Sequence, residues 1–196
     1  MTRLMRTSSL EKRPVVTMAG DDLAQIKDIV YAAGGGQVGD FTLAGRGIFA
    51  GPLKTSLAWS SVASLGSDAV MIADEQALDS SDEVLHSSAA SGGSGGNVLG
   101  SRVLTDGGTD LGKVIDVIIE VSQGGSGQCD VVGYEIEASE ALGTHGTDVL
   151  IPLPDTIAVS GEHLIVPASA RDFVSHDLAG FGAAVEQFRA QLEADR

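Results

Sequence analysis

Three glycines, Gly34, Gly36 and Gly39, stand in the spacing G-x-G-x-x-G directly after an apolar run at 26–31. In dinucleotide-binding folds this spacing leads from a strand into a helix, whose N-terminus holds the pyrophosphate. Here the following residues, 38–44, alternate between apolar and polar side chains, which predicts a strand. The glycines are therefore predicted to form a hairpin loop, and we expect no nucleotide cofactor.

The side chains that most often build metal or catalytic sites are few and scattered. They are His86, His145, His163, His176 and the single cysteine, Cys129. No two histidines share a short metal-ligand spacing, whereas a zinc site needs several converging ligands. A catalytic thiol would need an activating base or dipole, so we interpret Cys129 as inert. The sequence predicts no metal site and no catalytic residue.

Two aspartates, Asp28 and Asp116, stand in the middle of expected strands among apolar neighbours. They occupy equivalent positions in the internal repeat described below. We interpret both as structural carboxylates that accept backbone N–H bonds, and the alternative is a functional carboxylate in a site.

A segment at 44–54 carries two cations in an otherwise acidic chain, together with apolar side chains among glycines. Its candidate interface residues are Arg46, Ile48, Phe49 and Lys54. Under one interpretation the segment is an irregular loop folded over the end of a β-domain. Under the other it is a protein-binding edge, with Phe49 as a buried anchor and Arg46 as an ion-pair or hydrogen-bond donor.

An internal duplication supplies the elements that must position these residues. Residues 15–31 and 103–119 align without a gap at an offset of 88, and six of the 17 positions are identical. The identical pairs are Val15/Val103, Thr17/Thr105, Gly20/Gly108, Asp22/Asp110, Leu23/Leu111 and Asp28/Asp116. The likeness continues from 41–43 to 134–136, so the chain contains two copies of one small unit.

Each copy is predicted to consist of short strands separated by turns. The expected strands are 15–17, 24–31, 38–44, 53–59 and 69–72, with a helical turn near 61–65, and then 102–105, 112–121, 130–137, 148–152 and 163–166. Five short strands in about 70 residues predict a small antiparallel barrel. The expected domains are a first barrel at 1–73, an acidic and then Gly/Ser-rich linker at 74–100, a second barrel at 101–172 and a C-terminal helix at 173–196.

The C-terminal segment changes to a helical period, and Asp177 is a suitable N-cap. After Leu178, its apolar face consists of Phe181, Val185, Phe188 and Leu192. This face must be covered, either by the chain's own barrel, by a second helix in a homodimer or by a partner groove. The last four residues are therefore candidate interface residues.

The net charge of −15 is unevenly distributed. Residues 1–13 contain four basic residues and one acid, so the remainder contains eight basic and 26 acidic residues. Such a body is repelled by nucleic-acid phosphates and by anionic lipid, and we expect no direct nucleic-acid binding. We interpret the basic N-terminus as a solvated tail. The single cysteine and the lack of an apolar run of about 20 residues predict a cytoplasmic protein without a transmembrane segment.

One order of residues occurs in both copies. In the first it consists of Arg13-Pro14-Val15-Val16, Gly20, Asp22-Leu23, Ile26-Lys27-Asp28-Ile29-Val30, Gly39, Phe41-Thr42-Leu43, Trp59-Ser60-Ser61-Val62, Gly66 and Asp68-Ala69-Val70-Met71. This order resembles the PRC-barrel domain, known from the H subunit of the photosynthetic reaction centre and from the C-terminal part of a ribosome maturation factor. The resemblance implies a small β-barrel that binds other proteins and has no catalytic residues of its own.

Together these features favour a mainly β protein with two tandem small antiparallel β-barrels and a C-terminal amphipathic α-helix. We expect a non-enzymatic module for protein–protein interaction and assembly, without cofactor or metal. One alternative is a small-ligand sensor or enzyme that uses a cleft between the barrels. Another is assistance in ribosome or RNA processing through contact with a ribosomal protein.

Overall fold

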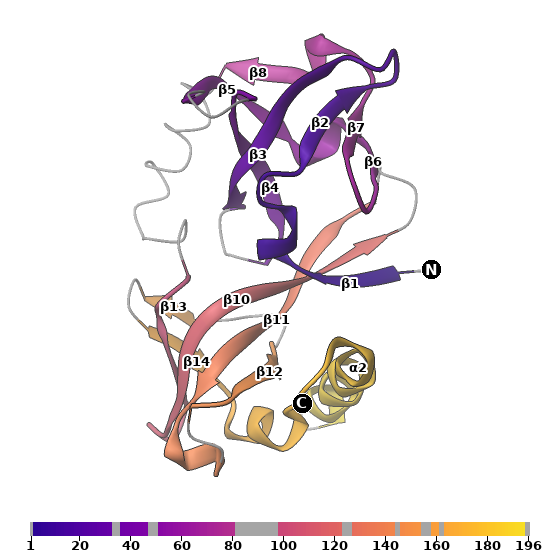
Figure 1. Ribbon diagram of the computed structural model, residues 1–196. Coiled ribbons are helices and arrows are strands. Elements are labelled where there is room, and N and C mark those ends of the chain that lie inside the picture. Colours follow the sequence, from indigo (N-terminus) through magenta and orange to yellow (C-terminus); the bar gives the residue numbers. More distant parts are fainter. Residues whose placement is uncertain are drawn as a thin grey trace.

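The computed structural model describes residues 2–32, 36–46, 51–80, 98–122, 127–143, 146–153, 158–160 and 163–194. Within them the chain forms two seven-stranded sheets, stacked as two lobes, and one α-helix beside the second lobe (Figure 1). The predicted fold class, barrel-like β-domains followed by a C-terminal helix, is confirmed.

The first sheet has the strand order β6-β7-β2-β3-β4-β5-β8. Its strands are β2 (Pro14–Thr17), β3 (Asp22–Tyr31), β4 (Val38–Ala44), β5 (Pro52–Ala58), β6 (Val62–Leu65), β7 (Val70–Ile72) and β8 (Leu78–Ser80). All neighbours are antiparallel except β2 and β7, which are parallel and join the start of the unit to its end. This pairing curls the sheet.

Two parts of this unit differ in detail from the sequence prediction. The helical turn expected near 61–65 is the short 3-10 helix η2 (Trp59–Ser61) followed by strand β6, because the chain pairs there with β7. The expected linker at 74–100 begins with the 3-10 helix η3 (Glu75–Ala77) and then β8, which pairs with β5 and extends the first sheet. Residues 81–97 lie outside the described residues.

The second sheet repeats this topology as β13-β14-β9-β10-β11-β12. Its strands are β9 (Arg102–Thr105), β10 (Asp110–Ser122), β11 (Cys129–Ala138), β12 (Asp148–Pro152), β13 (Ala158–Ser160) and β14 (His163–Val166), with the 3-10 helix η4 (Glu140–Leu142) after β11 and η5 (Ala168–Phe173) after β14. Strand β14 pairs with β9 in parallel, as β7 pairs with β2.

Backbone hydrogen bonds recur at the same offset as the sequence repeat. The Lys12 N–H donates to the Ile26 carbonyl at 2.8 Å, and the Gly100 N–H donates to the Val114 carbonyl at 2.8 Å. Lys12 and Gly100 both have a positive φ, of 62° and 85°. The duplication therefore extends back to residue 12, where the second copy has the glycine that this backbone conformation favours.

The N-terminal segment belongs to the second sheet, so its prediction as a solvated tail is wrong. Strand β1 (Thr2–Arg6) pairs antiparallel with β10, with Arg6 opposite Ile118. The 3-10 helix η1 (Thr7–Leu10) then carries the chain across to β2 in the first sheet (Figure 1). Met5 and Leu10 are buried and belong to the core. A strand in one sheet thus leads directly into the other.

One apolar core runs through both units. A single cluster of buried side chains includes Phe41 and Trp59 from the first unit and Val117 and Tyr134 from the second. Burial of apolar surface is the main force that favours folding, so the two units pack as one body instead of moving apart.

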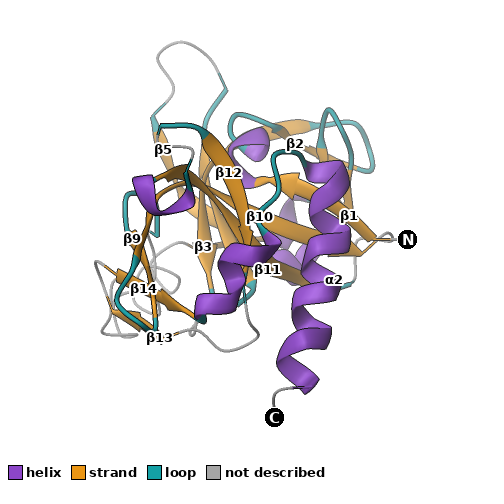
Figure 2. Cartoon of the chain, turned by 90° about the horizontal axis from the view of Figure 1, so that it is seen from below, coloured by secondary structure: helices purple, strands orange, loops and turns teal. Residues whose placement is uncertain are grey.

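The helix α2 (Leu178–Ala194) covers the opposite face of the second sheet (Figures 1 and 2). Asp177 caps it as predicted, because its carboxylate accepts the Gly180 N–H at 2.7 Å. Phe181 lies against Gly133, where an added Cβ would come within 2.3 Å of the ring and 2.6 Å of the Ile151 carbonyl oxygen. Glycine is thus required for the helix to approach the strand this closely.

We expect Gly133→Ala to lower the free energy of unfolding by about 1–3 kcal/mol, since the methyl group overpacks the contact with Phe181. The matched control is Gly182→Ala on α2, where a Cβ meets only Leu4 Cδ1 at 3.5 Å. That change should be neutral or stabilise the helix by up to about 1 kcal/mol. Urea unfolding of both variants tests this, and equal effects would contradict the docking geometry.

Candidate protein-interaction surface

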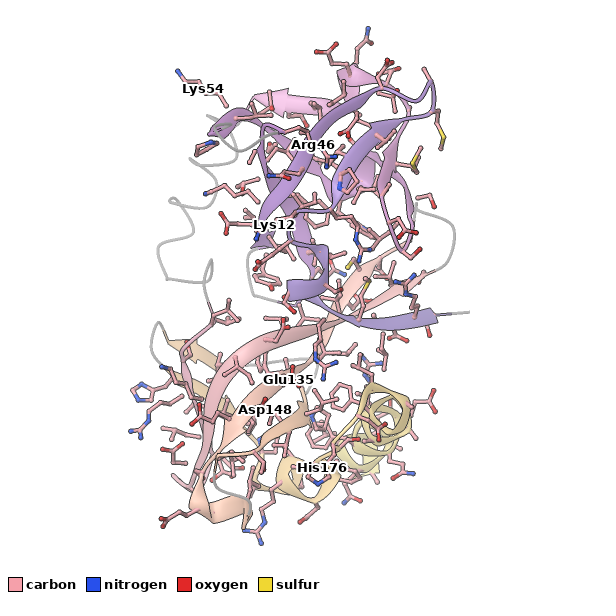
Figure 3. The ribbon with its side chains drawn as sticks, in the orientation of Figure 1. Lys12, Arg46, Lys54, Glu135, Asp148 and His176 are labelled. Carbon is pink, nitrogen blue, oxygen red and sulfur yellow. The ribbon has the colours of Figure 1, made fainter. Side chains whose placement is uncertain are left out.

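The predicted edge at 44–54 is only partly described. Arg46 forms an ion pair with Asp22 at the start of β3, at 3.0 Å. Lys54 is exposed on β5 and points away from the sheet (Figure 3). Ile48 and Phe49 lie outside the described residues. The role of this edge in binding stays a prediction.

The apolar face of α2 is not a free interface. Phe181, Val185 and Phe188 are buried against the chain's own second sheet, and Leu192 is half-buried against the same core. Of the coverings left open by the sequence, docking within the chain is the one observed. These four residues are therefore removed from the candidate interface, because their side chains are already covered.

Asp116 is buried at the crossing between the two sheets. Its carboxylate accepts the Thr7 hydroxyl at 2.9 Å, the Ser8 N–H at 3.2 Å and the Ser8 hydroxyl. It also accepts the N–H of Val117 at 2.7 Å. A buried charge needs such donors, and three of the four come from the segment that leaves β1 for the first sheet. Asp116 is thus a structural carboxylate that fixes the crossing.

Asp28, its repeat counterpart, lies in a different environment. Its side chain is 62% exposed and pairs with Lys27 at 2.8 Å. Its backbone N–H donates to the Thr42 hydroxyl at 3.1 Å. The expected bonds from backbone N–H groups to the Asp28 carboxylate are not found among the described residues, because no crossing segment covers this position there.

An ion pair reinforces the crossing next to Asp116. Arg6 donates two hydrogen bonds to Glu135, at 2.6 and 2.7 Å. The Glu135 side chain is 13% exposed, and its bonds to the guanidinium raise the pKa of Arg6. Asp148 lies near Glu135 on this sheet (Figure 3), and its negative charge also raises the pKa of Arg6. The bidentate geometry holds β1 in register.

Hydrogen bonds near the start of β11 also join the two units. The Trp59 ring N–H donates to the Gly127 carbonyl at 2.7 Å, and the Gln37 amide donates to Asp130 at 2.9 Å. The Val131 N–H donates to the Gly36 carbonyl at 2.9 Å. The glycine-rich hairpin between β3 and β4 thus contacts the second unit, and it precedes a strand as predicted.

The described residues do not assemble a metal or catalytic group. They contain no set of three or more His, Cys, Asp or Glu side chains placed to hold a metal ion. His176 is exposed and His163 half-buried, while His86 and His145 lie outside the described residues. A hollow of about 400 Å³ is lined by Thr109, Asp110, Ser139, Glu140 and Ala141. It belongs to the second unit, so it does not match the cleft between barrels that the ligand-sensor alternative requires.

Comparison with known proteins agrees with this architecture. The family model described as PRC-barrel domain matches residues 3–78. Residues 3–78 form a PRC-barrel domain. No curated protein matches the chain. None of the helices in the described ranges has the length and apolar character that a membrane crossing requires.

The match covers strands β2 to β7 of the first sheet and ends at the first residue of β8, and it also includes most of β1, which the structure places in the second sheet. The second unit lies beyond the match, and its strands β13, β14, β9, β10, β11 and β12 pair in the same order as β6, β7, β2, β3, β4 and β5 of the first. The sequence resemblance to this family is therefore confirmed in the first copy, and the second copy shares its topology.

The outer face of the PRC-barrel domain, directed away from the core, carries a polar row across four strands. Asp28 lies opposite Thr42, Thr42 opposite Ser56, and Ser56 opposite Asp79. Asp40 lies two residues before Thr42 on β4. Sequence analysis did not identify Asp40, Ser56 or Asp79, because their pairing across β4, β5 and β8 has no local signal.

We expect Asp116→Ala to lower the free energy of unfolding by about 1.5–3 kcal/mol, the range for hydrogen bonds to a charged group. Asp28→Ala, its repeat counterpart, should change it by less than about 0.5 kcal/mol, because Asp28 is exposed. Urea denaturation of both variants measures the difference. Similar losses would contradict the assignment of Asp116 as the anchor of the crossing.

Cys129 is expected to be unreactive in the native protein. Burial, and then the neighbouring Asp130, raise the pKa of Cys129 to about 12. Since the thiolate is the nucleophile, little of the reactive form exists at pH 8. Ellman's reagent at pH 8 should label the native protein far more slowly than the urea-unfolded protein. Equal rates would show that the thiol is accessible.

Proposed function

We propose that this protein is a non-enzymatic interaction module that binds another protein through its first barrel. The carrying observation is the PRC-barrel domain at residues 3–78, a type of domain associated with protein interaction and assembly. A cytoplasmic location is part of the proposal.

The difference in how the sheet faces of the two units are covered supports the first barrel as the one that binds a partner. In the second unit, one sheet face meets the shared core and the other is covered by α2. In the first unit, Asp28 and Asp79 on the outer side of the sheet are exposed, as are Arg46 and Lys54 at the edge. The second barrel thus supports the fold, whereas the first offers surface to a partner.

Affinity capture with the full chain from a native lysate of the source organism tests this proposal. The wild-type chain should retain a defined protein partner, and Arg46→Glu with Phe49→Ala should lose it. The variant should stay folded, since the Arg46–Asp22 pair is exposed and such pairs contribute little stability.

The matched control is Arg171→Glu, which reverses an exposed arginine on η5 and should retain the partner. If the double variant binds as the wild type does, the predicted edge is not the interface. Capture of ribosomal proteins would favour the processing alternative. Recovery of a small molecule without any protein would favour the ligand-sensor alternative and overturn the proposal.

A further inference from the structure

The outer face of the first sheet corresponds to the face that α2 covers in the second. Thr42 pairs with Ser56 as Glu135 pairs with Leu150, and Asp40 pairs with Ala58 as Gly133 pairs with Pro152. Asp40 therefore takes the place of Gly133, and Ser56 the place of Leu150. We define the outer face as Asp28, Asp40, Thr42, Ser56 and Asp79.

The two equivalent faces differ in what covers them. In the second unit, Phe181 packs over Gly133, and Leu150 is buried beneath α2. In the first unit, no α-helix within the described residues packs on the equivalent strands. Asp28 and Asp79 are exposed, and Asp40 and Thr42 are half-buried. The fold thus places a helix on this face of the second barrel, whereas the described residues place none on the equivalent face of the first.

The described residues supply a counter-ion for one carboxylate of the outer face but not for the other two. Lys27 pairs with Asp28, but Asp40 and Asp79 form no ion pair among the described residues. Burial, and then the proximity of Asp79, raise the pKa of Asp40 above its ordinary value. The ionised form of Asp40 is therefore disfavoured, and a cation placed between the two carboxylates would stabilise it.

A buried hydroxyl in the same row also lacks a partner. Ser56 has no exposed surface, and its Oγ has no hydrogen-bond partner among the residues that the structure describes. It lies directly opposite Asp79 on β8 and Thr42 on β4, on the side of β5 away from the core residue Leu57. Unpaired buried polar atoms are uncommon and costly, so Ser56 is a weak point of the sheet beside Asp79.

We propose that the outer face binds a basic helical segment of a partner protein, with a Lys or Arg side chain between Asp40 and Asp79. The inference rests on the proposed function and deepens it. A helix is favoured because α2 occupies the equivalent face of the second unit. A basic partner is favoured by the two unpaired carboxylates and by the net charge of −15, which opposes a second copy of this chain.

The test is an NMR titration of the labelled full chain with a synthetic probe, an alanine-based 18-residue peptide with lysine at every fourth position. Amide shifts should change in β3, β4, β5 and β8, and binding should weaken with added salt. A peptide of equal charge interrupted by two central prolines should bind at least about tenfold more weakly, because proline disfavours helix.

Asp40→Asn with Asp79→Asn should weaken binding of the helical peptide at least tenfold. The matched control is Glu186→Gln with Glu193→Gln, which removes the same charge from the exposed side of α2 and should leave binding unchanged. The first double variant should fold at least as stably as the wild type, because it relieves repulsion between carboxylates. Thermal unfolding checks this.

Equal weakening by both double variants, or shifts spread over the whole acidic surface, would overturn the inference. Equal binding of the helical and the proline-interrupted peptide would overturn it as well. The Asp40/Asp79 variant should also lose the partner found by affinity capture. If it retains that partner, the interaction module stands and the outer face is excluded as its binding site.

Discussion

The buried carboxylate of Asp116 is the constraint on which the arrangement of the two barrels depends. A charge in this position must be hydrogen-bonded, and Thr7 and Ser8 supply most of its donors. This requirement holds η1 against β10. With η1 fixed, β1 must join the second sheet and β2 must begin the first. The chain therefore passes from the second sheet to the first near residue 10. The apolar core that both units share packs against this crossing segment.

The same constraint makes the two copies of the repeat unequal. Only the second aspartate of the pair meets the crossing segment, so Asp116 is buried whereas Asp28 remains exposed with Lys27. The C-terminal helix adds to the inequality, since α2 covers the second sheet where Gly133 admits the ring of Phe181. The second barrel thereby uses both of its faces for folding. The first keeps a polar face, and this difference underlies the proposed division of roles.

Local patterns in the sequence predicted much of this fold. The strands that carry alternating side chains, such as β4, agree with their predicted bounds, as do the N-cap at Asp177 and the duplication. The predictions that failed concern elements whose structure depends on contacts between residues far apart in the sequence. Strand β1 is short and basic, and only its pairing with β10 makes it a strand. The candidate site was harder to predict for the same reason: periodicity identified the apolar stripe of α2, but not that the chain itself covers it.

The two units also show why two different sequence patterns can form the same arrangement of strands. Strand β3 alternates up to Ile26, and beyond its bulge Ile29 and Tyr31 are partly buried against the core while Asp28 is exposed. Strand β10 instead has a continuous buried run from Val117 to Ile119, since the core covers one side and α2 the other. Covering a face thus changes which residues its strands require. The first barrel retains the pattern of a sheet with an open face, and the family match at residues 3–78 falls on this unit. On this face, Asp40 and Asp79 have no counter-ion within the described ranges, which is why the proposed partner is basic.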